Sequence, residues 1–515
     1  MYTALRVNLR PLNRRRILRG MKRKSGLIGL IAIGLAALYW SGSVSRDGSG
    51  IWPRLISSRP NYEALLADRA QQRQRSAPTR SQPAEAATPS ASATSESIRG
   101  RATVPREAGV PSGADLRDSP ARTADALAFP PAFWPDFRGR NRDGRYDGTP
   151  IRTAWPDEGL PLLWKQPIGL GYASFVAAEG RAFTIEQRPE AEVVSAYDLD
   201  TGRELWTHRW EGEFVEYQGG DGPRATPTYD QGRIYALGAL GELRSLDART
   251  GGLIWRRNIL EDHRAENLPW GMAASPLIVD EKVIVLPGGA SGRSVAAYDT
   301  ATGDVLWTSL DDQQAYASPL VATLAGIRQL IIVSATRVVG LTIEDGRLLW
   351  EYPWANDLGI NVAQPLLVGN ERVFVSSGYG HGAAVFEVAR DGDRFSTRTI
   401  WRNTRMKNKF TSSVLHQGHV YGLDESILAC VDVATGELKW KGGRYGYGQI
   451  LLAGDHLIVL AEDGEVALVR ATPDRHTELA SFPAIEGRTW NHPIIAGGRL
   501  LVRNLREMAA FDIRP

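Results

Sequence analysis

The stretch AYDTATGDVLW, Ala297 to Trp307, decides the fold of this chain. Nearly the same phrase occurs as AYDLDTGRELW at 196–206, SLDARTGGLIW at 245–255 and CVDVATGELKW at 430–440. One copy would be a turn between two strands, but copies spread along the chain indicate a structural unit that repeats.

Within the phrase, the aspartate and the glycine predict a tight turn. An aspartate side chain accepts backbone N–H bonds from the residues that follow it, and glycine adopts the positive φ that such a turn needs. The tryptophan four residues after the glycine is predicted to pack between neighbouring sheets, because it buries a large area there. The residues assigned to these structural roles are Asp198, Gly202, Trp206, Asp247, Gly251, Trp255, Asp299, Gly303, Trp307, Gly346, Trp350, Asp432, Gly436 and Trp440.

Each repeat also holds four short apolar or alternating runs. In residues 274–310 they are ASPLIVD, KVIVLPG, SVAAYD and DVLWTSL, separated by Asp, Gly and Ser, a pattern typical of a four-stranded antiparallel meander. The tryptophans that close the repeats are 39 to 52 residues apart, a period that points to propellers or solenoids.

Eight repeats can be aligned, but the last one ends after MAAFDIRP (508–515), three strands in. The strand PLLWKQPI at 161–168 stands before the first repeat and is predicted to complete the eighth blade, since closure of the ring removes exposed sheet edges. We therefore predict an all-β fold over residues 131–515, an eight-bladed β-propeller closed by an N-terminal strand. Seven blades are the alternative if a weak repeat fails.

The first 45 residues predict a membrane anchor. Residues 1–24 hold nine Arg/Lys and no Asp or Glu, and residues 25–45 are uncharged. About 20 such residues span a bilayer core, and basic residues on one side only place the N-terminus in the cytoplasm. We predict a basic cytoplasmic tail (1–24), a transmembrane signal anchor (25–45) in the inner membrane, and a periplasmic or extracellular propeller. A cleaved signal peptide is the alternative.

Residues 46–130 are rich in Ala, Ser, Pro, Arg and Gln and nearly free of aromatic residues, so we predict a disordered linker. The net charge of +3 hides an asymmetry, because residues 131–515 carry 40 Lys/Arg against 49 Asp/Glu. The basic character belongs to the N-terminal region, and the composition gives no reason to expect nucleic-acid binding.

The D-x-x-T-G-x-x-x-W phrase in four-stranded repeats resembles the pyrroloquinoline quinone (PQQ) repeat, over about 350 residues. The segment WPDFRGRNRDGRYDG (134–148) looks like the lead-in of uncharacterised exported members. This resemblance implies the fold and leaves the activity open. The family includes PQQ-dependent alcohol dehydrogenases and also non-enzymatic members, such as the B subunit of the outer-membrane β-barrel assembly machine.

The quinone enzymes of that family place PQQ on the propeller axis with a disulfide of adjacent cysteines, a stacking Trp, a Ca²⁺ ion held by Glu, Asn and Asp, and an Asp base. The single cysteine, Cys430, excludes such a disulfide, and no carboxylate cluster has the spacing of Ca²⁺ ligands. We expect no metal site and no cofactor, and a binding or scaffolding module of the cell envelope rather than an enzyme. The alternative is a PQQ- and Ca²⁺-dependent alcohol or sugar dehydrogenase with a divergent site.

The residues just before each innermost strand form the candidate binding site, because these segments are expected to crowd one mouth of the central channel. Aromatic faces beside Arg and Lys suit a flat anionic ligand or an acidic or aromatic peptide, so the expected partner is an envelope protein or peptide. The alternative is that the aromatic side chains only fill the funnel and the cations are solvated. The candidates are Tyr172, Arg224, Trp270, Tyr316, Asn361, Lys409, Phe410, Tyr447, Trp490 and His492.

Overall fold

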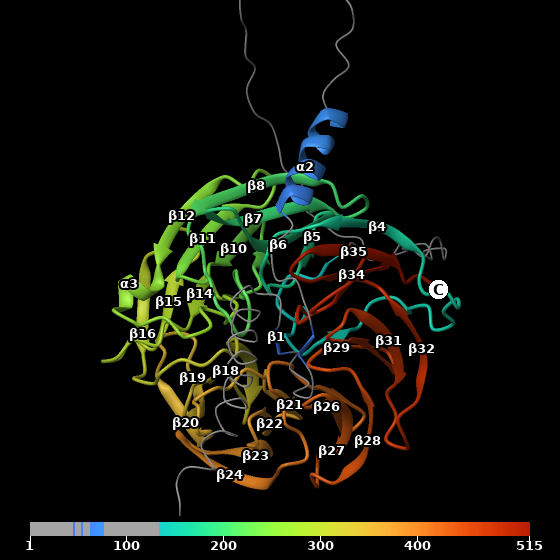
Figure 1. Ribbon diagram of the computed structural model, residues 1–515. Coiled ribbons are helices and arrows are strands. Elements are labelled where there is room, and N and C mark those ends of the chain that lie inside the picture. Colours follow the sequence, from blue (N-terminus) through green and yellow to red (C-terminus); the bar gives the residue numbers. More distant parts are fainter. Residues whose placement is uncertain (1–44, 47–52, 55–61, 77–132) are drawn as a thin grey trace, which may run out of the picture. The chain divides into compact units, whose positions relative to one another are not determined.

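The computed structural model describes residues 45–46, 53–54, 62–76 and 133–515. Residues 133–515 form eight antiparallel sheets arranged in a ring (Figure 1). Seven sheets contain four consecutive strands in chain order, one of them with a short fifth strand added, and the eighth is completed by a strand from the start of the domain. The prediction of an all-β, eight-bladed propeller is confirmed.

The first four blades follow one another directly, and we number them by their order along the chain. Blade 1 consists of β5 (Val176–Ala178), β6 (Arg181–Arg188), β7 (Ala191–Asp198) and β8 (Glu204–Glu211). Blade 2 consists of β9 (Thr228–Asp230), β10 (Arg233–Leu237), β11 (Glu242–Asp247) and β12 (Leu253–Asn258). Blade 3 consists of β13 (Leu277–Val279), β14 (Lys282–Val285), β15 (Val295–Asp299) and β16 (Val305–Ser309). Blade 4 consists of β17 (Leu320–Leu324), β18 (Ile327–Val333), β19 (Arg337–Leu341) and β20 (Leu348–Pro353).

The remaining four blades keep the same strand order, except that the outer strand of blade 8 comes from the start of the domain. Blade 5 consists of β21 (Leu366–Val368), β22 (Arg372–Ser377), β23 (Gly382–Asp391) and β24 (Arg394–Asn403). Blade 6 consists of β25 (Val414–His416), β26 (His419–Asp424), β27 (Ile427–Asp432) and β28 (Leu438–Arg444). Blade 7 consists of β29 (Gln449–Ala453), β30 (His456–Leu460), β31 (Glu465–Arg470) and β32 (Glu478–Pro483). Blade 8 consists of β33 (Ile494–Ala496), β34 (Arg499–Arg503), β35 (Glu507–Asp512) and β4 (Leu162–Pro167).

The ring closes through β4, which pairs antiparallel with β35 and places Trp164 opposite Ala510. Figure 1 shows the C-terminal strands β34 and β35 beside β4, the strand from the start of the domain. The first strand of the domain thus supplies the outer strand that the last repeat lacks. The predicted closure is confirmed, and it leaves no blade with only three strands.

Neighbouring blades are joined by the tryptophan of one blade and the turn of the next. The Trp255 indole of blade 2 donates to the Thr300 carbonyl oxygen of blade 3 at 2.9 Å, and Gly303 lies against the same ring. In that turn the Asp299 carboxylate accepts the N–H groups of Ala301 and Thr302, each at 2.8 Å. The same indole bond joins Trp164 to Leu199, Trp206 to Ala248, Trp307 to Ile343, Trp401 to Val433 and Trp440 to Thr472.

Trp350 is the exception, because it faces blade 5, whose β23 and β24 are joined by a hairpin without the phrase. Its indole N–H donates within its own blade, to Gln329 at 2.6 Å, and its ring packs edge-on against Phe386. At the closing seam, Phe482 takes the position of the tryptophan and contacts Gly159, a glycine with φ of 92° just before β4.

The described residues outside the blades form three further features. Two short strands, β1 (Ser45–Arg46) and β2 (Pro53–Arg54), pair with each other. Helix α3 (Ile259–His263) follows blade 2, with the Asn258 side chain as its N-cap. Strand β3 (Arg145–Tyr146) adds to blade 7 in parallel with β29.

Helix α2 (Tyr62–Ser76) falls inside the predicted disordered linker, so the structure differs from that prediction over this stretch. Its composition is polar, so the helix gains its stability from tertiary contacts and not from an apolar face in the local sequence. The residues of α2 up to Gln72 belong to the same compact unit as the propeller.

The predicted anchor at 25–45 lies, apart from Ser45, outside the described residues. In the part of the chain that the structure describes, no helix is long and apolar enough to cross a membrane.

Candidate binding site at the channel mouth

Short segments before the innermost strands carry a belt of polar side chains that runs from blade to blade. The backbone N–H of one belt residue donates to the side chain of the next, at distances of 2.7 to 3.1 Å. These bonds fix the path of each segment that leads into an innermost strand. They therefore also fix the positions of the side chains that come just before the belt residues. Its members, in order around the ring, are Ser174, Thr226, Ser275, Ser318, Gln364 and Ser412.

On the side of the belt toward the innermost strands, the lead-in segment 134–146 fills the channel. Arg142 is 1% exposed and donates to the backbone carbonyls of Ser275, at 3.2 Å, and Pro319, at 2.9 Å. The same guanidinium forms a 2.6 Å ion pair with Asp136. The segment also bonds to blades 1, 2, 6, 7 and 8, so it forms the floor of the candidate site.

Arg138 completes this floor, donating to the Ser413 carbonyl at 2.6 Å and to Nε2 of His492 at 3.1 Å. Burial lowers the pKa of Arg138 to about 10. Burial, together with the nearby positive charge of Arg138, lowers the pKa of His492 to about 3. Because the other imidazole nitrogen, Nδ1, lies 2.8 Å from the Pro493 carbonyl, His492 is a neutral hydrogen-bonding residue of the floor and does not face the mouth.

On the other side of the belt, four of the candidate aromatic side chains gather. The Trp490 ring lies 5.2 Å from Tyr172 and 4.5 Å from Phe410, and Phe410 lies 4.9 Å from Tyr447. These rings come from the segments that precede blades 1, 6, 7 and 8. We call these four residues the aromatic cluster.

Cations border the aromatic cluster. The Lys409 ammonium lies 4.6 Å from the Tyr447 ring, 5.4 Å from Tyr379 and 5.7 Å from Phe410. Arg488 lies 4.8 Å above Trp490. No carboxylate within the described ranges forms an ion pair with Lys409, and its ammonium lies near the faces of three rings.

Arg224 borders the cluster at Tyr172, over the rings of Tyr172 and Phe214. Burial lowers the pKa of its guanidinium, which donates to the carbonyls of Gly220 and Gly222 at 2.8 Å each. These bonds hold the loop between β8 and β9, where Tyr217 is 90% exposed.

Three other predicted site residues, Trp270, Tyr316 and Asn361, lie outside the aromatic cluster. Trp270 and Tyr316 form a separate edge-to-face pair at 5.9 Å, and burial raises the pKa of Tyr316 to about 12. Asn361 is 1% exposed and its amide donates to the carbonyls of Ser334 and Trp354. We therefore regard Asn361 as part of the loop framework.

Sequence reasoning missed several residues at the mouth. Arg488 precedes its innermost strand by more positions than the alignment considered, and Tyr379 lies in the turn between β22 and β23. Glu462, between β30 and β31, accepts the Trp490 indole N–H at 3.0 Å and the Tyr447 N–H at 3.1 Å. The turns between the second and third strands of each blade lie at the same mouth, and their sequences would have been the signal to examine.

The donor set of this mouth does not fit PQQ with its calcium ion. The face of Trp490 is covered by Tyr172 and Arg488, and the Glu462 carboxylate is engaged by two N–H donors. Cys430 is buried in β27, where burial raises its pKa to about 12. Across the described ranges, no three His, Cys, Asp or Glu side chains gather closely enough to hold a metal ion.

Comparisons with known proteins agree with the fold described above, a propeller of PQQ-like repeats. Residues 190–442 match the family model described as outer membrane protein assembly factor BamB. This stretch is just under half of the chain, and over it the chain is similar to that family of PQQ-like repeat proteins.

Individual relatives fall into two groups. BamB of Shewanella oneidensis is 22% identical over 304 residues, 56% of this chain and 73% of that protein. The 1-butanol dehydrogenase (cytochrome c) of Thauera butanivorans is 31% identical over 113 residues, but these are 21% of this chain and 16% of the dehydrogenase. The crystal structure of quinohemoprotein alcohol dehydrogenase from Comamonas testosteroni superposes with a TM-score of 0.54 over 74% of this chain and 80% of that chain, at 14% identity, a similarity of fold alone.

Proposed function

We propose that this chain is a membrane-tethered, exported scaffold of the cell envelope that binds a partner protein at the channel mouth. The observation that carries the proposal is Lys409, an ammonium held among three aromatic rings without a carboxylate partner among the described residues. Such a group attracts a carboxylate, and the rings beside it offer apolar contact area. The partner is therefore an acidic segment that also carries aromatic or other apolar side chains.

The mouth has further features of a recognition surface. Tyr217 and Tyr379, 90% and 37% exposed, stand on loops at this end of the ring, and tyrosine is enriched at protein interfaces. The lead-in segment lies below the mouth, so the proposed partner contacts the side chains of the mouth and does not enter the channel. The match to a family of outer membrane assembly factors supports the assignment to a non-enzymatic binding role.

A Lys409→Ala variant of the full chain tests the site. We expect partner binding to weaken about tenfold or more, since a hydrogen bond to a charged group contributes on the order of 1.5–3 kcal/mol. A photo-crosslinking residue in place of Tyr379 should trap the partner in cells, and Lys409→Ala should abolish that product. Lys439→Ala is the matched control, because Lys439 lies in the outer strand β28, away from the mouth.

A second crosslinking position separates specific from general association. Arg249 is exposed in the turn between β11 and β12, at the opposite ends of the strands. A crosslinker there should trap little of the same partner. Equal trapping at Arg249 and Tyr379, or trapping that survives Lys409→Ala, would contradict a partner site at the mouth.

The membrane tether is tested separately. The full chain should fractionate with inner membranes and resist extraction by alkaline carbonate, and a deletion of residues 1–45 should abolish both properties. The intact N-terminus, read by mass spectrometry, distinguishes an anchor from a cleaved signal peptide. Recovery of a processed chain in the soluble periplasmic fraction would refute the tether.

A quinone-dependent dehydrogenase is the second candidate, favoured by the short matches of about 30% identity to quinone dehydrogenases. Purified full chain would be mixed with PQQ and Ca²⁺, desalted, and assayed for quinone absorbance and dye-linked alcohol oxidation. Because the donor set does not fit, we expect neither signal to survive desalting. Retained quinone with turnover would overturn the scaffold assignment.

A further inference from the structure

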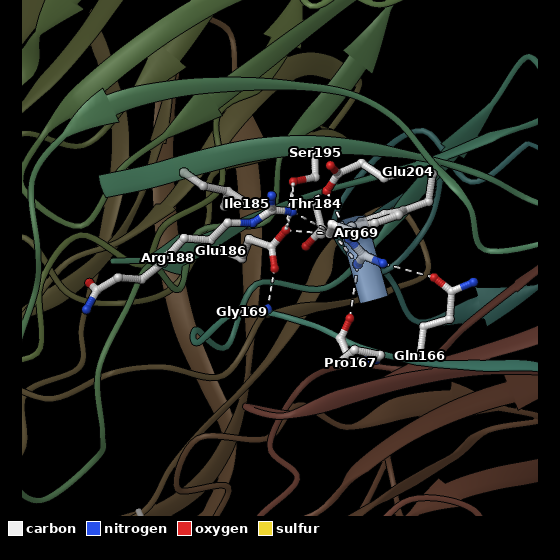
Figure 2. A network of polar contacts seen from close by, with 12 residues as sticks. Arg69, Gln166, Pro167, Gly169, Thr184, Ile185, Glu186, Arg188, Ser195 and Glu204 are labelled. Carbon is white, nitrogen blue, oxygen red and sulfur yellow. Dashed lines mark hydrogen bonds and ion pairs between the residues drawn. The ribbon is translucent and has the colours of Figure 1, made fainter. Parts of the chain in front are cut away.

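Helix α2 docks on the outer side of the propeller, where blade 8 meets blade 1. Figure 2 shows Arg69 pointing from α2 into a network of polar side chains. Arg69 is only 2% exposed. It donates to the Pro167 carbonyl at 3.0 Å and to the Gln166 side chain at 3.1 Å, both in β4, and forms a 3.1 Å ion pair with Glu204 in β8.

A second side chain of α2, Gln72, also bonds to both β4 and β8. The Gln72 amide donates to Gln166 of β4 at 2.9 Å and its oxygen accepts the Glu204 N–H of β8 at 3.0 Å. Leu65, 0% exposed, adds the apolar contact of the helix. Three residues spaced four and three apart therefore give α2 one binding face.

The propeller side of this contact is a built site, which we call the seam socket (Glu186, Arg188, Ser195, Tyr197 and Glu204). Glu186 is 0% exposed and accepts from Tyr197 at 2.6 Å, Ser195 at 2.7 Å and Arg188 at 2.8 Å. Arg188 also pairs with Glu204. Burial opposes ionisation of Glu186, but Arg188 and Arg503 outweigh it and lower the pKa of the carboxyl to about 2.

We propose that α2 is an intramolecular clasp, which occupies the seam socket and joins blade 8, in which the ring closes, to blade 1. The helix lacks the means to form alone. It has 15 residues, near the lower limit for an isolated helix in water, and a largely polar sequence. Its order therefore comes from docking, and Arg69 makes most of the directional contacts.

A docked α2 limits how far the propeller can lie from the membrane, a consequence that rests on the proposed membrane tether. Only residues 46–61 lie between the predicted anchor and α2, and 16 residues span at most about 58 Å. With α2 released, 87 residues separate the predicted anchor from Phe133, the first described residue of the propeller domain. Fully extended, they span at most about 310 Å. Docking of α2 thus restricts how far the mouth can move from the membrane.

Hydrogen–deuterium exchange of the full chain tests the clasp, with Arg69→Gln compared against Arg73→Gln. Arg73 is an exposed arginine of the same helix, so it is a matched control. In the wild-type chain, amides of 62–72 should exchange slowly. We expect Arg69→Gln to accelerate them at least tenfold and Arg73→Gln to leave them unchanged, while amides in the blade strands stay protected in both. Fast exchange of α2 in the wild type, or equal protection in both variants, would overturn the clasp.

A second measurement separates the clasp from the tether. The full chain, with Cys430→Ser and a dye on Asp304→Cys, would be inserted into vesicles whose headgroups carry an acceptor dye. We expect energy transfer to fall in Arg69→Gln and to stay unchanged in Arg73→Gln. If α2 is protected but the chain does not associate with vesicles, the tether fails and the clasp stands. If the chain inserts and energy transfer does not respond to Arg69→Gln, the restriction of reach is wrong.

Discussion

At the scale of single residues, His492 shows how burial converts a candidate ligand into a structural group. The sequence placed it at the mouth beside Trp490, whereas in the structure its Nε2 accepts from Arg138 in the channel floor. The imidazole is 4% exposed, and a positive charge lies next to it, so protonation is opposed twice. The same residue that a sequence alignment marks as a binding group thus makes the fold sensitive to acid.

The low pKa of His492 predicts the sign of a pH effect. Its pKa is about 3 in the folded chain, against 6.5 for an ordinary histidine. The unfolded chain therefore binds more protons between these values, and the free energy of unfolding falls as pH drops from 6.5 toward 3.

Urea unfolding across this pH range would measure the effect. In wild type, His492 contributes up to about 1.4 kcal/mol per pH unit to the slope of the free energy of unfolding against pH. A His492→Gln variant should lack this contribution, and we expect it to be less stable than wild type at neutral pH. The difference between wild type and variant isolates His492 from the other titrating groups. Identical slopes would show that His492 is accessible to protons in the folded chain.

At the scale of elements, the repeated phrase is a joint between blades. In blades 1, 2, 3, 4 and 6 the turn presents a glycine against the tryptophan of the blade before it, and the indole N–H bonds to a carbonyl of that turn. Trp350 bonds to Gln329 in its own blade, because β23 and β24 of blade 5 are joined by a hairpin, whereas Trp440 still bonds to the Thr472 carbonyl in the glycine-free turn of blade 7. The joint is thus a property of two consecutive repeats.

Replacing Gly303 with alanine should break one joint. A Cβ there would lie 2.7 Å from the Trp255 ring, at a backbone φ of 74°. Left-handed strain costs about 1–2 kcal/mol and overpacking about 1–3 kcal/mol, so we expect a loss of about 2–5 kcal/mol. Gly326→Ala controls for strain, since Gly326 has φ of 78° and open space around it.

Chemical denaturation of the two glycine variants is the measurement. The loss in Gly303→Ala should exceed that in Gly326→Ala, and Trp255 fluorescence should change only in the former. Equal losses would mean that the contact with Trp255 adds nothing to backbone strain.

At the scale of the whole molecule, a ring of eight sheets leaves a central channel, and this chain fills it with residues from outside the repeats. The lead-in bonds to blades 1, 2, 3, 4, 6, 7 and 8 through Arg138, Arg142 and short ladder contacts. Sheets that otherwise contact only their neighbours are thereby connected across the ring. The lead-in should therefore affect the stability of the ring as a unit.

Arg142→Met tests that connection. The substitution leaves Asp136 buried without its counter-charge and removes donors from the carbonyls of Ser275 and Pro319. Breaking a buried ion pair by removing one partner costs about 3–5 kcal/mol. Thermal unfolding should shift down in one cooperative step, and Arg140→Met, at an exposed position of the same segment, should shift it little. A multistep transition in Arg142→Met would show that the blades unfold independently of the lead-in.

The candidate site could be predicted only in outline. Tyr172, Phe410, Tyr447 and Trp490 gather because equivalent positions of a closed ring must converge on its axis. Asn361 and His492 share those positions but face the loop framework and the floor. Arg488 and Tyr379 lie outside the aligned positions and reach the mouth through loop paths.

The sequence by itself determined the propeller, the number of its blades and the strand that closes it. The physical reason is local, since Asp299, Gly303 and Trp307 form their turn and joint from neighbouring residues, and repetition fixes the count. Tertiary structure alone decided the channel floor and the docking of α2. Arg142 bonds to a carbonyl 177 residues away and Arg69 to one 98 residues away. A polar segment shows no periodic pattern that would reveal such contacts beforehand.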